Sequence, residues 1–197
     1  MARMVSLSAV ANWTADFGEL AALSPAALAV GLFLMLDKRR TTALAWLLSL
    51  VVSLGLAALL KATHAPVSGH AAVAVAVVGG FAILMWRDAF ALGAATRFLS
   101  VPILLLAAGV CVSVFYLRWH SALDVAGGIA VGALAPVSLA RVRLGPGHGR
   151  RWGGAVALVL VAGLVAALHG VRIDDQVAHH LRLAVERIAL AWLQRPA

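Results

Sequence analysis

The sequence predicts an all-α, polytopic membrane protein, built as a bundle of six transmembrane helices. Of its 197 residues, 63% are hydrophobic and only 12% are charged, and the mean hydropathy is +0.98. Soluble domains are closer to half apolar and a quarter charged, and a soluble fold of this length cannot hide so much apolar surface. A bilayer removes that constraint, because an apolar helix of about 17 to 20 residues crosses roughly 30 Å of hydrocarbon.

The apolar residues fall into long runs separated by short polar segments. This pattern divides the chain into an interfacial segment (1–19), the six-helix bundle (20–170) and an amphipathic C-terminal segment (171–197). Gly128 and Gly132 have the GxxxG spacing, which predicts close packing between helices in a membrane. The six predicted spans are Leu20–Leu36, Ala43–Leu60, His70–Trp86, Phe98–Leu117, Asp124–Ala140 and Gly153–Gly170.

The two terminal segments have different characters. In residues 1–19 the apolar stretch is brief and is interrupted by Asn12, Thr14 and Asp16, so we expect an interfacial segment and no cleavable signal peptide. In the C-terminal segment, apolar residues recur at steps of four, three and four, which predicts an amphipathic helix on the outer surface. These residues are Leu181, Val185, Ile188 and Trp192.

The basic residues predict the orientation in the membrane. The net charge is +8, and most of the Lys and Arg residues lie in alternate loops, so we expect anionic lipid headgroups, and no nucleic acid, as their partner. Short basic loops stay in the cytoplasm, which places the loops 61–70 and 118–124 on the outer face. In a bacterium this face of the inner membrane is periplasmic. The basic loops contain Lys38, Arg39, Arg40, Arg87, Arg97, Arg141, Arg143, Arg150 and Arg151.

A histidine and an aspartate stand four residues apart at one of the outward loops. His120 and Asp124 share one face if this segment is helical. A carboxylate beside an imidazole fixes its tautomer and stabilises the positive charge that develops when the imidazole acts as a nucleophile. Taken alone, the pair can equally be two polar residues at a membrane interface.

The other outward loop, KATHAPVSGHA, contains groups that suit a phosphate. Ser68 precedes a predicted helix start and is a natural N-cap, and the free N–H groups of that turn attract anions. Gly69 lets an oxygen approach the backbone closely, and His70 can act as a general acid. The alternative is a capped helix with an interfacial histidine and with Lys61 extended towards the headgroups.

Together, the two loops resemble the type-2 phosphatidic acid phosphatase (PAP2) superfamily of membrane lipid phosphatases over roughly residues 20–140. That family carries K-x6-RP, PSGH and SR-x5-H-x3-D motifs in this order. The second motif is present at 67–70 as VSGH, and the third as Ser113, His120 and Asp124. The resemblance implies that His120 forms a phosphohistidine, that Asp124 orients it and that His70 protonates the leaving group. It also implies that the phosphoryl oxygens are bound by Lys61, Ser68 and the Gly69 amide.

The chain departs from the family pattern at both motif arginines. Seven residues after Lys61 stands Ser68, and Val114 occupies the arginine position of the third motif, so Arg118 and His64 are the nearby basic candidates to compensate. The resemblance implies a metal- and cofactor-independent phosphatase that acts on phosphatidic acid, phosphatidylglycerol phosphate or a polyprenyl diphosphate. The alternatives are a lipid phosphotransferase and a weak or inactive lipid-binding or scaffolding protein. The sequence does not indicate an oligomeric state.

Overall fold

The computed structural model describes residues 6–87, 89–90, 92–143, 151–169 and 183, and every element in these residues is helical. Two elements depart from α-helical geometry: η1 is a 3₁₀ helix and η2 is a π-helix. The elements are α1 (Leu7–Ala15), η1 (Asp16–Gly18), α2 (Leu20–Leu36), α3 (Arg40–Ala62), α4 (Gly69–Val73), η2 (Ala74–Gly79), α5 (Gly80–Trp86), α6 (Ala94–Tyr116), α7 (Ala122–Gly132), α8 (Leu134–Arg141) and α9 (Arg151–Leu168).

All six predicted spans are helical over most of their length, but six membrane crossings are not confirmed. Four segments of the described chain are long and apolar enough to cross a membrane: Arg40–Ala62, Gly69–Trp86, Thr96–Tyr116 and Ala122–Arg141. A fifth exists if residues 7–18 and α2, which are bent by 45°, count as one span, and Gly154–Leu168 is a shorter apolar helix. The predicted amphipathic stripe at 181–192 lies outside the described residues.

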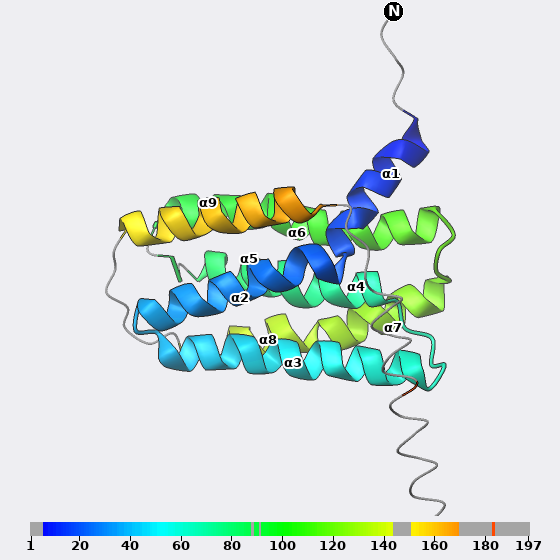
Figure 1. Cartoon of the computed structure of the whole chain (residues 1–197), viewed down its shortest axis with the longest axis horizontal. Helices are drawn as coiled ribbons and strands as arrows, with labels where there is room; N and C mark the ends of the chain where they lie inside the picture. Colours follow the sequence, from blue (N-terminus) through cyan, green and yellow to red (C-terminus); the bar gives the residue numbers. More distant parts are fainter. Residues whose placement is uncertain (1–5, 88, 91, 144–150, 170–182, 184–197) are drawn as a thin grey trace, which may run out of the picture.

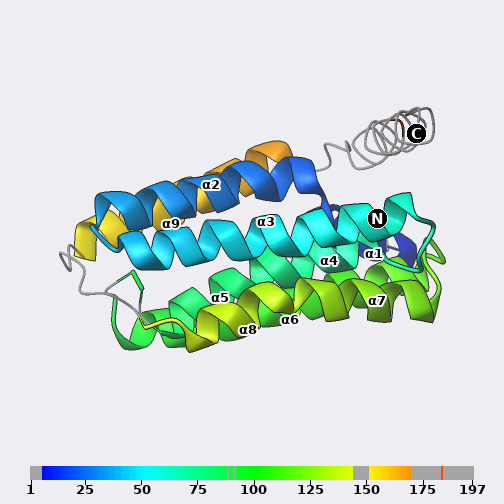
Figure 2. The same cartoon turned by 90° about the horizontal axis from the view of Figure 1, so that it is seen from below.

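Apart from α1, which is inclined to the others, the helices run roughly parallel or antiparallel to one another and form a bundle around α4, η2 and α5 (Figures 1 and 2). This central segment packs against α3, α6, α7 and α8, and most of it is buried. Trp46 of α3 is fully buried, and its indole N–H donates to the Ala27 carbonyl oxygen at 2.8 Å, which joins α3 to α2. Packing in the core therefore fixes the position of the side chains in the first turn of α4.

The outer surface of the bundle is apolar. Large side chains such as Leu32, Leu48 and Leu105 are more than half exposed. A soluble protein does not expose apolar surface along whole helices, whereas hydrocarbon chains solvate it. The surface and the spans together identify an integral membrane protein.

The two ends of the bundle differ in charge, as the sequence predicts. The loops after α3 and α6, which carry the candidate motifs, lie at one end, and the loops after α2, α5 and α8 lie at the other (Figure 1). Basic residues of the described chain gather at this second end: Lys38, Arg39, Arg40, Arg87, Arg97, Arg141 and Arg143.

Candidate active site

The first half of the site is the start of α4. Ser68 is its N-cap, with an extended backbone and a side-chain oxygen that accepts from the Ala71 N–H at 3.3 Å, as the sequence predicts. Gly69 begins the helix, so His70 lies in its first turn, and 15% of the His70 side chain is exposed. The cap thus fixes the backbone that carries the imidazole.

The second half is the turn between α6 and α7. Ser121 caps α7: its hydroxyl accepts from the Asp124 N–H at 3.2 Å, while Asp124 Oδ2 accepts from the Ser121 N–H and hydroxyl, each at 2.8 Å. This reciprocal capping box satisfies N–H groups that a helix start otherwise leaves unbonded. His120 stands directly before the box, four residues before Asp124.

The structure brings the two halves together at one end of the bundle. The Ser68 N–H donates to the Asp124 carbonyl oxygen at 2.8 Å, which joins the loop before α4 to the first turn of α7. The ring centroids of His70 and His120 are 6.1 Å apart, and the Trp119 ring lies 5.6 Å from His70. Imidazoles from the first turn of α4 and from the turn between α6 and α7 therefore lie close together.

The glycines of α7 permit this approach. A Cβ on Gly128 would lie 2.5 Å from the Ser68 carbonyl oxygen, and one on Gly132 would lie 2.7 Å from that of Ala72. A Cβ on Gly127 would collide with the Pro66 carbonyl oxygen. The GxxxG pair that the sequence marks as a packing signal is thus part of a wider contact, which packs α7 against α4 and the loop before it.

A buried carboxylate from the N-terminal segment also reaches His70. Glu19, which is 2% exposed, lies between η1 and α2, and its Oε1 accepts from His70 Nε2 at 3.0 Å. The preceding residue, Gly18, packs against His70, because a Cβ on Gly18 would lie 3.1 Å from the His70 Cβ. This residue belongs to none of the motifs, and its single local signal in the sequence is an acid placed directly before an apolar run.

The predicted cationic ligands lie at the same end of the bundle. Lys61 is half-buried in the last turn of α3, and His64 and Arg118 are exposed in the loops after α3 and α6. Their roles in phosphate binding, and those of Ser68 and Gly69, stay predictions; Ser68 itself is fully buried.

The position of the missing arginine is apolar. Val114 is fully buried in a cluster that includes Ala71, Cys111 and Val125, with Trp119 against it. A buried cation is costly unless it is paired, so this packing suits valine. Any cationic ligand of a bound phosphate must therefore come from another position.

One comparison with known proteins matches the part of the chain that carries the two loops. The model of the PAP2 superfamily matches residues 59–144, the region that contains both loops. No curated protein and no solved structure matches the chain. The resemblance predicted from the motifs is confirmed over this region, which is similar to the PAP2 superfamily.

Proposed function

We propose that this protein is a membrane lipid phosphatase that removes a phosphate from a lipid phosphomonoester or diphosphate through a phosphohistidine. Phosphatidic acid, phosphatidylglycerol phosphate and a polyprenyl diphosphate are the candidate substrates. The observation that carries the proposal is the 6.1 Å separation of the His70 and His120 rings, within the family region. The proposal is that one phosphoryl group binds between nitrogens of the two rings.

The first step transfers the phosphoryl group to the protein. A ring nitrogen of His120 attacks phosphorus with its lone pair, and a P–N bond forms as the P–O bond to the lipid breaks. The electron pair of that bond stays with the leaving oxygen, which takes a proton from His70. Asp124, four residues after His120, stabilises the positive charge that develops on the ring.

The second step restores the protein. A water molecule attacks phosphorus, gives its proton to His70 and displaces His120, so that the P–N bond breaks and inorganic phosphate leaves. In both steps the charge on the phosphoryl oxygens needs cationic or N–H donors, because electrostatic stabilisation supplies much of the catalysis of phosphoryl transfer. Lys61, Arg118, His64 and the Gly69 amide are the proposed donors.

The site lies at the end of the bundle opposite the basic loops. By the positive-inside rule, this end faces the periplasm if the protein resides in a bacterial inner membrane. We propose this orientation, in which the phosphate of a lipid in the outer leaflet reaches the two histidines.

A second candidate is a catalytically weak or inactive lipid-binding protein. The observation that favours it is the fully buried Val114, which stands in an apolar cluster where the family pattern has an arginine. A phosphotransferase, in which an alcohol replaces water in the second step, uses the same site chemistry.

Phosphate release from purified protein in detergent tests the phosphatase and its proposed ligands. We expect release from at least one of the three lipid phosphates, unchanged by excess chelator. Arg118→Ala is expected to lower kcat/KM about tenfold, because hydrogen bonds to charged groups contribute about 1.5 to 3 kcal/mol. Arg97→Ala, at the other end of the bundle, is the matched control.

The alternatives give different results in the same assay. The scaffolding protein releases no phosphate from any of the lipids. A phosphotransferase releases little phosphate until an acceptor alcohol is added. Loss of activity with chelator contradicts the metal-independent mechanism.

A further inference from the structure

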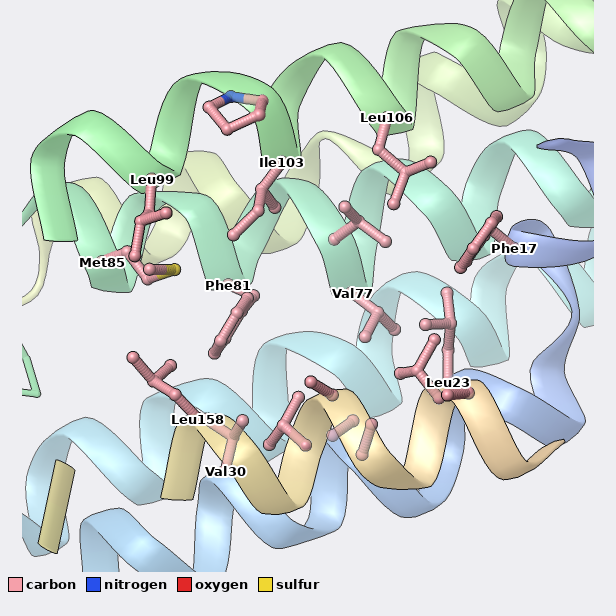
Figure 3. Close-up of a pocket in the computed structure, with 18 of the residues that line it drawn as sticks. Phe17, Leu23, Val30, Val77, Phe81, Met85, Leu99, Ile103, Leu106 and Leu158 are labelled. Atoms are coloured by element: carbon pink, nitrogen blue, oxygen red, sulfur yellow. The ribbon is translucent and has the colours of Figure 1, made fainter. Parts of the chain in front are cut away.

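An apolar slot runs along the inside of the bundle from the candidate site towards the basic end (Figure 3). Its volume is about 610 Å³. Residues of α1, η1, α2, α3, η2, α5, α6 and α9 line it, and Figure 3 shows Ile103, Leu106 and Leu158 directed into it. Nearly all of its lining is apolar, so its natural occupant is a hydrocarbon.

The slot begins beside His70. Phe17 lines its outer end, and the next residue, Gly18, packs against His70. On α6, Leu106 lines the slot, and Val110, one turn further along, lies beside Gly18. A molecule with its phosphate between the two histidines therefore has its nearest apolar space here.

The slot also opens sideways, between α6 and α9. Ala162 and Ala166 of α9 and Leu99 of α6 are exposed, although they line it. Along α9 the lining extends from Leu158 to His169, which is roughly 16 Å at ~1.5 Å per residue. That is close to half of the ~30 Å hydrocarbon thickness, the length of a lipid chain in one leaflet.

We infer that this slot binds one hydrocarbon chain of the phosphorylated lipid whose headgroup occupies the candidate site. The inference rests on the proposed function and deepens it, because it makes the lipid chain part of substrate recognition. Chain entry between α6 and α9 needs no aqueous route, since both helices are apolar on their outer faces.

Photolabelling with hexadecyl phosphate that carries a diazirine at the chain terminus tests the inference. In His120→Ala, which cannot be phosphorylated on that ring, we expect labelling near Leu99, Met85 or Leu158. Excess hexadecyl phosphate should suppress it, and phosphatidylcholine should not. Ala162→Phe is expected to lower labelling about tenfold, because overfilling costs about 1 to 3 kcal/mol; Ala167→Phe, on the same helix but outside the lining, should not.

The outcomes separate the slot from the phosphatase. Equal competition by phosphatidylcholine means that the slot holds a bulk membrane lipid, which overturns the inference. Labelling that Ala162→Phe does not reduce also overturns it, whether or not the parent protein releases phosphate. Specific labelling of a protein without phosphatase activity supports the slot and contradicts the proposed function.

The buried carboxylate beside His70 carries a second, independent inference. We propose that Glu19 is a positioning residue for His70. Because the carboxylate accepts from Nε2 at 3.0 Å, Nε2 carries a hydrogen, and Nδ1 is the nitrogen that gives a proton to the leaving oxygen and takes one from water. This inference also rests on the proposed function.

Burial and the neighbouring backbone fix the position of Glu19 beside His70. It is 2% exposed, and burial of a carboxylate is costly unless a partner compensates it. The 3₁₀ turn η1 and the start of α2 fix its backbone, and Gly18 packs against His70. The N-terminal segment, outside the family region 59–144, thereby contributes to the site.

Substrates that differ in their leaving group test the positioning role. An alkyl alcohol needs a proton to leave, whereas p-nitrophenolate does not. In Glu19→Ala we expect kcat/KM for an alkyl lipid phosphate, which reports the step in which the leaving group departs, to fall about thirtyfold, a part of the ~10²- to 10⁴-fold that general acid catalysis supplies. We expect little change in kcat/KM for p-nitrophenyl phosphate, because its leaving group needs no proton.

Two further variants keep this test decisive. Glu19→Gln retains an oxygen that accepts from Nε2 and should recover most of the loss, and Asp16→Asn, on the same turn, should resemble the parent protein. Equal losses of kcat/KM with both leaving groups in Glu19→Ala indicate a purely structural role and overturn the inference. If the parent protein hydrolyses both substrates and Glu19→Ala does so equally well, the inference fails while the phosphatase stands.

Discussion

Replacing His120 with alanine should abolish phosphate release from the lipid substrate. The proposed nucleophile is then absent, and the expected loss in kcat is about 10⁴-fold or more, because the covalent pathway is closed. Steady-state phosphate release measures the loss. Rapid alkaline quenching of the parent protein with a radiolabelled lipid phosphate should trap an alkali-stable, acid-labile label, and the variant should carry none.

The variant at His70 gives the matching result. In His70→Ala the nucleophile is retained and the proton donor is lost, so we expect a smaller fall of about 10²- to 10⁴-fold. Gel filtration in detergent establishes that both variants keep the parent's dispersity. An His120→Ala protein that retains more than a third of the parent's kcat contradicts the proposal.

The membrane class was readable from the sequence because it depends on local quantities. The length and apolarity of each run are properties of consecutive residues, and all six runs are helical in the structure. The number of membrane crossings, in contrast, cannot be obtained from consecutive residues alone. It depends on whether residues 7–18 and α2, bent by 45°, act as one span, which is a property of their relative orientation.

The site could be predicted in part for a similar reason. The charge rule assigned the loops of His70 and His120 to one face, and they lie at one end of the bundle. The contact of Glu19 with His70 joins residues 51 positions apart, and no periodicity relates them. The slot likewise could not be predicted from the sequence, because it lies where side chains of several helices leave space between them.

Replacing Gly128 with alanine should damage the site through packing alone. The added methyl group would lie 2.5 Å from the Ser68 carbonyl oxygen and 2.9 Å from the Ala71 Cβ. A backbone oxygen cannot rotate away as a side chain can, so α7 must move away from α4. We expect kcat to fall about 10²-fold, since a displacement of ~1 Å at reacting groups can have that effect.

The control for this variant is a glycine without close neighbours. A Cβ at Gly55 of α3 meets no atom within 4 Å, so Gly55→Ala should leave kcat unchanged and should slightly stabilise the helix. We expect Gly128→Ala also to lower stability by about 1 to 3 kcal/mol, measured by thermal unfolding in detergent. The proposed cause is displacement of one ring from the other, so the loss in kcat must persist at temperatures where the variant is fully folded. If the two glycine variants behave alike, close packing of α7 on α4 does not set the distance between the histidines.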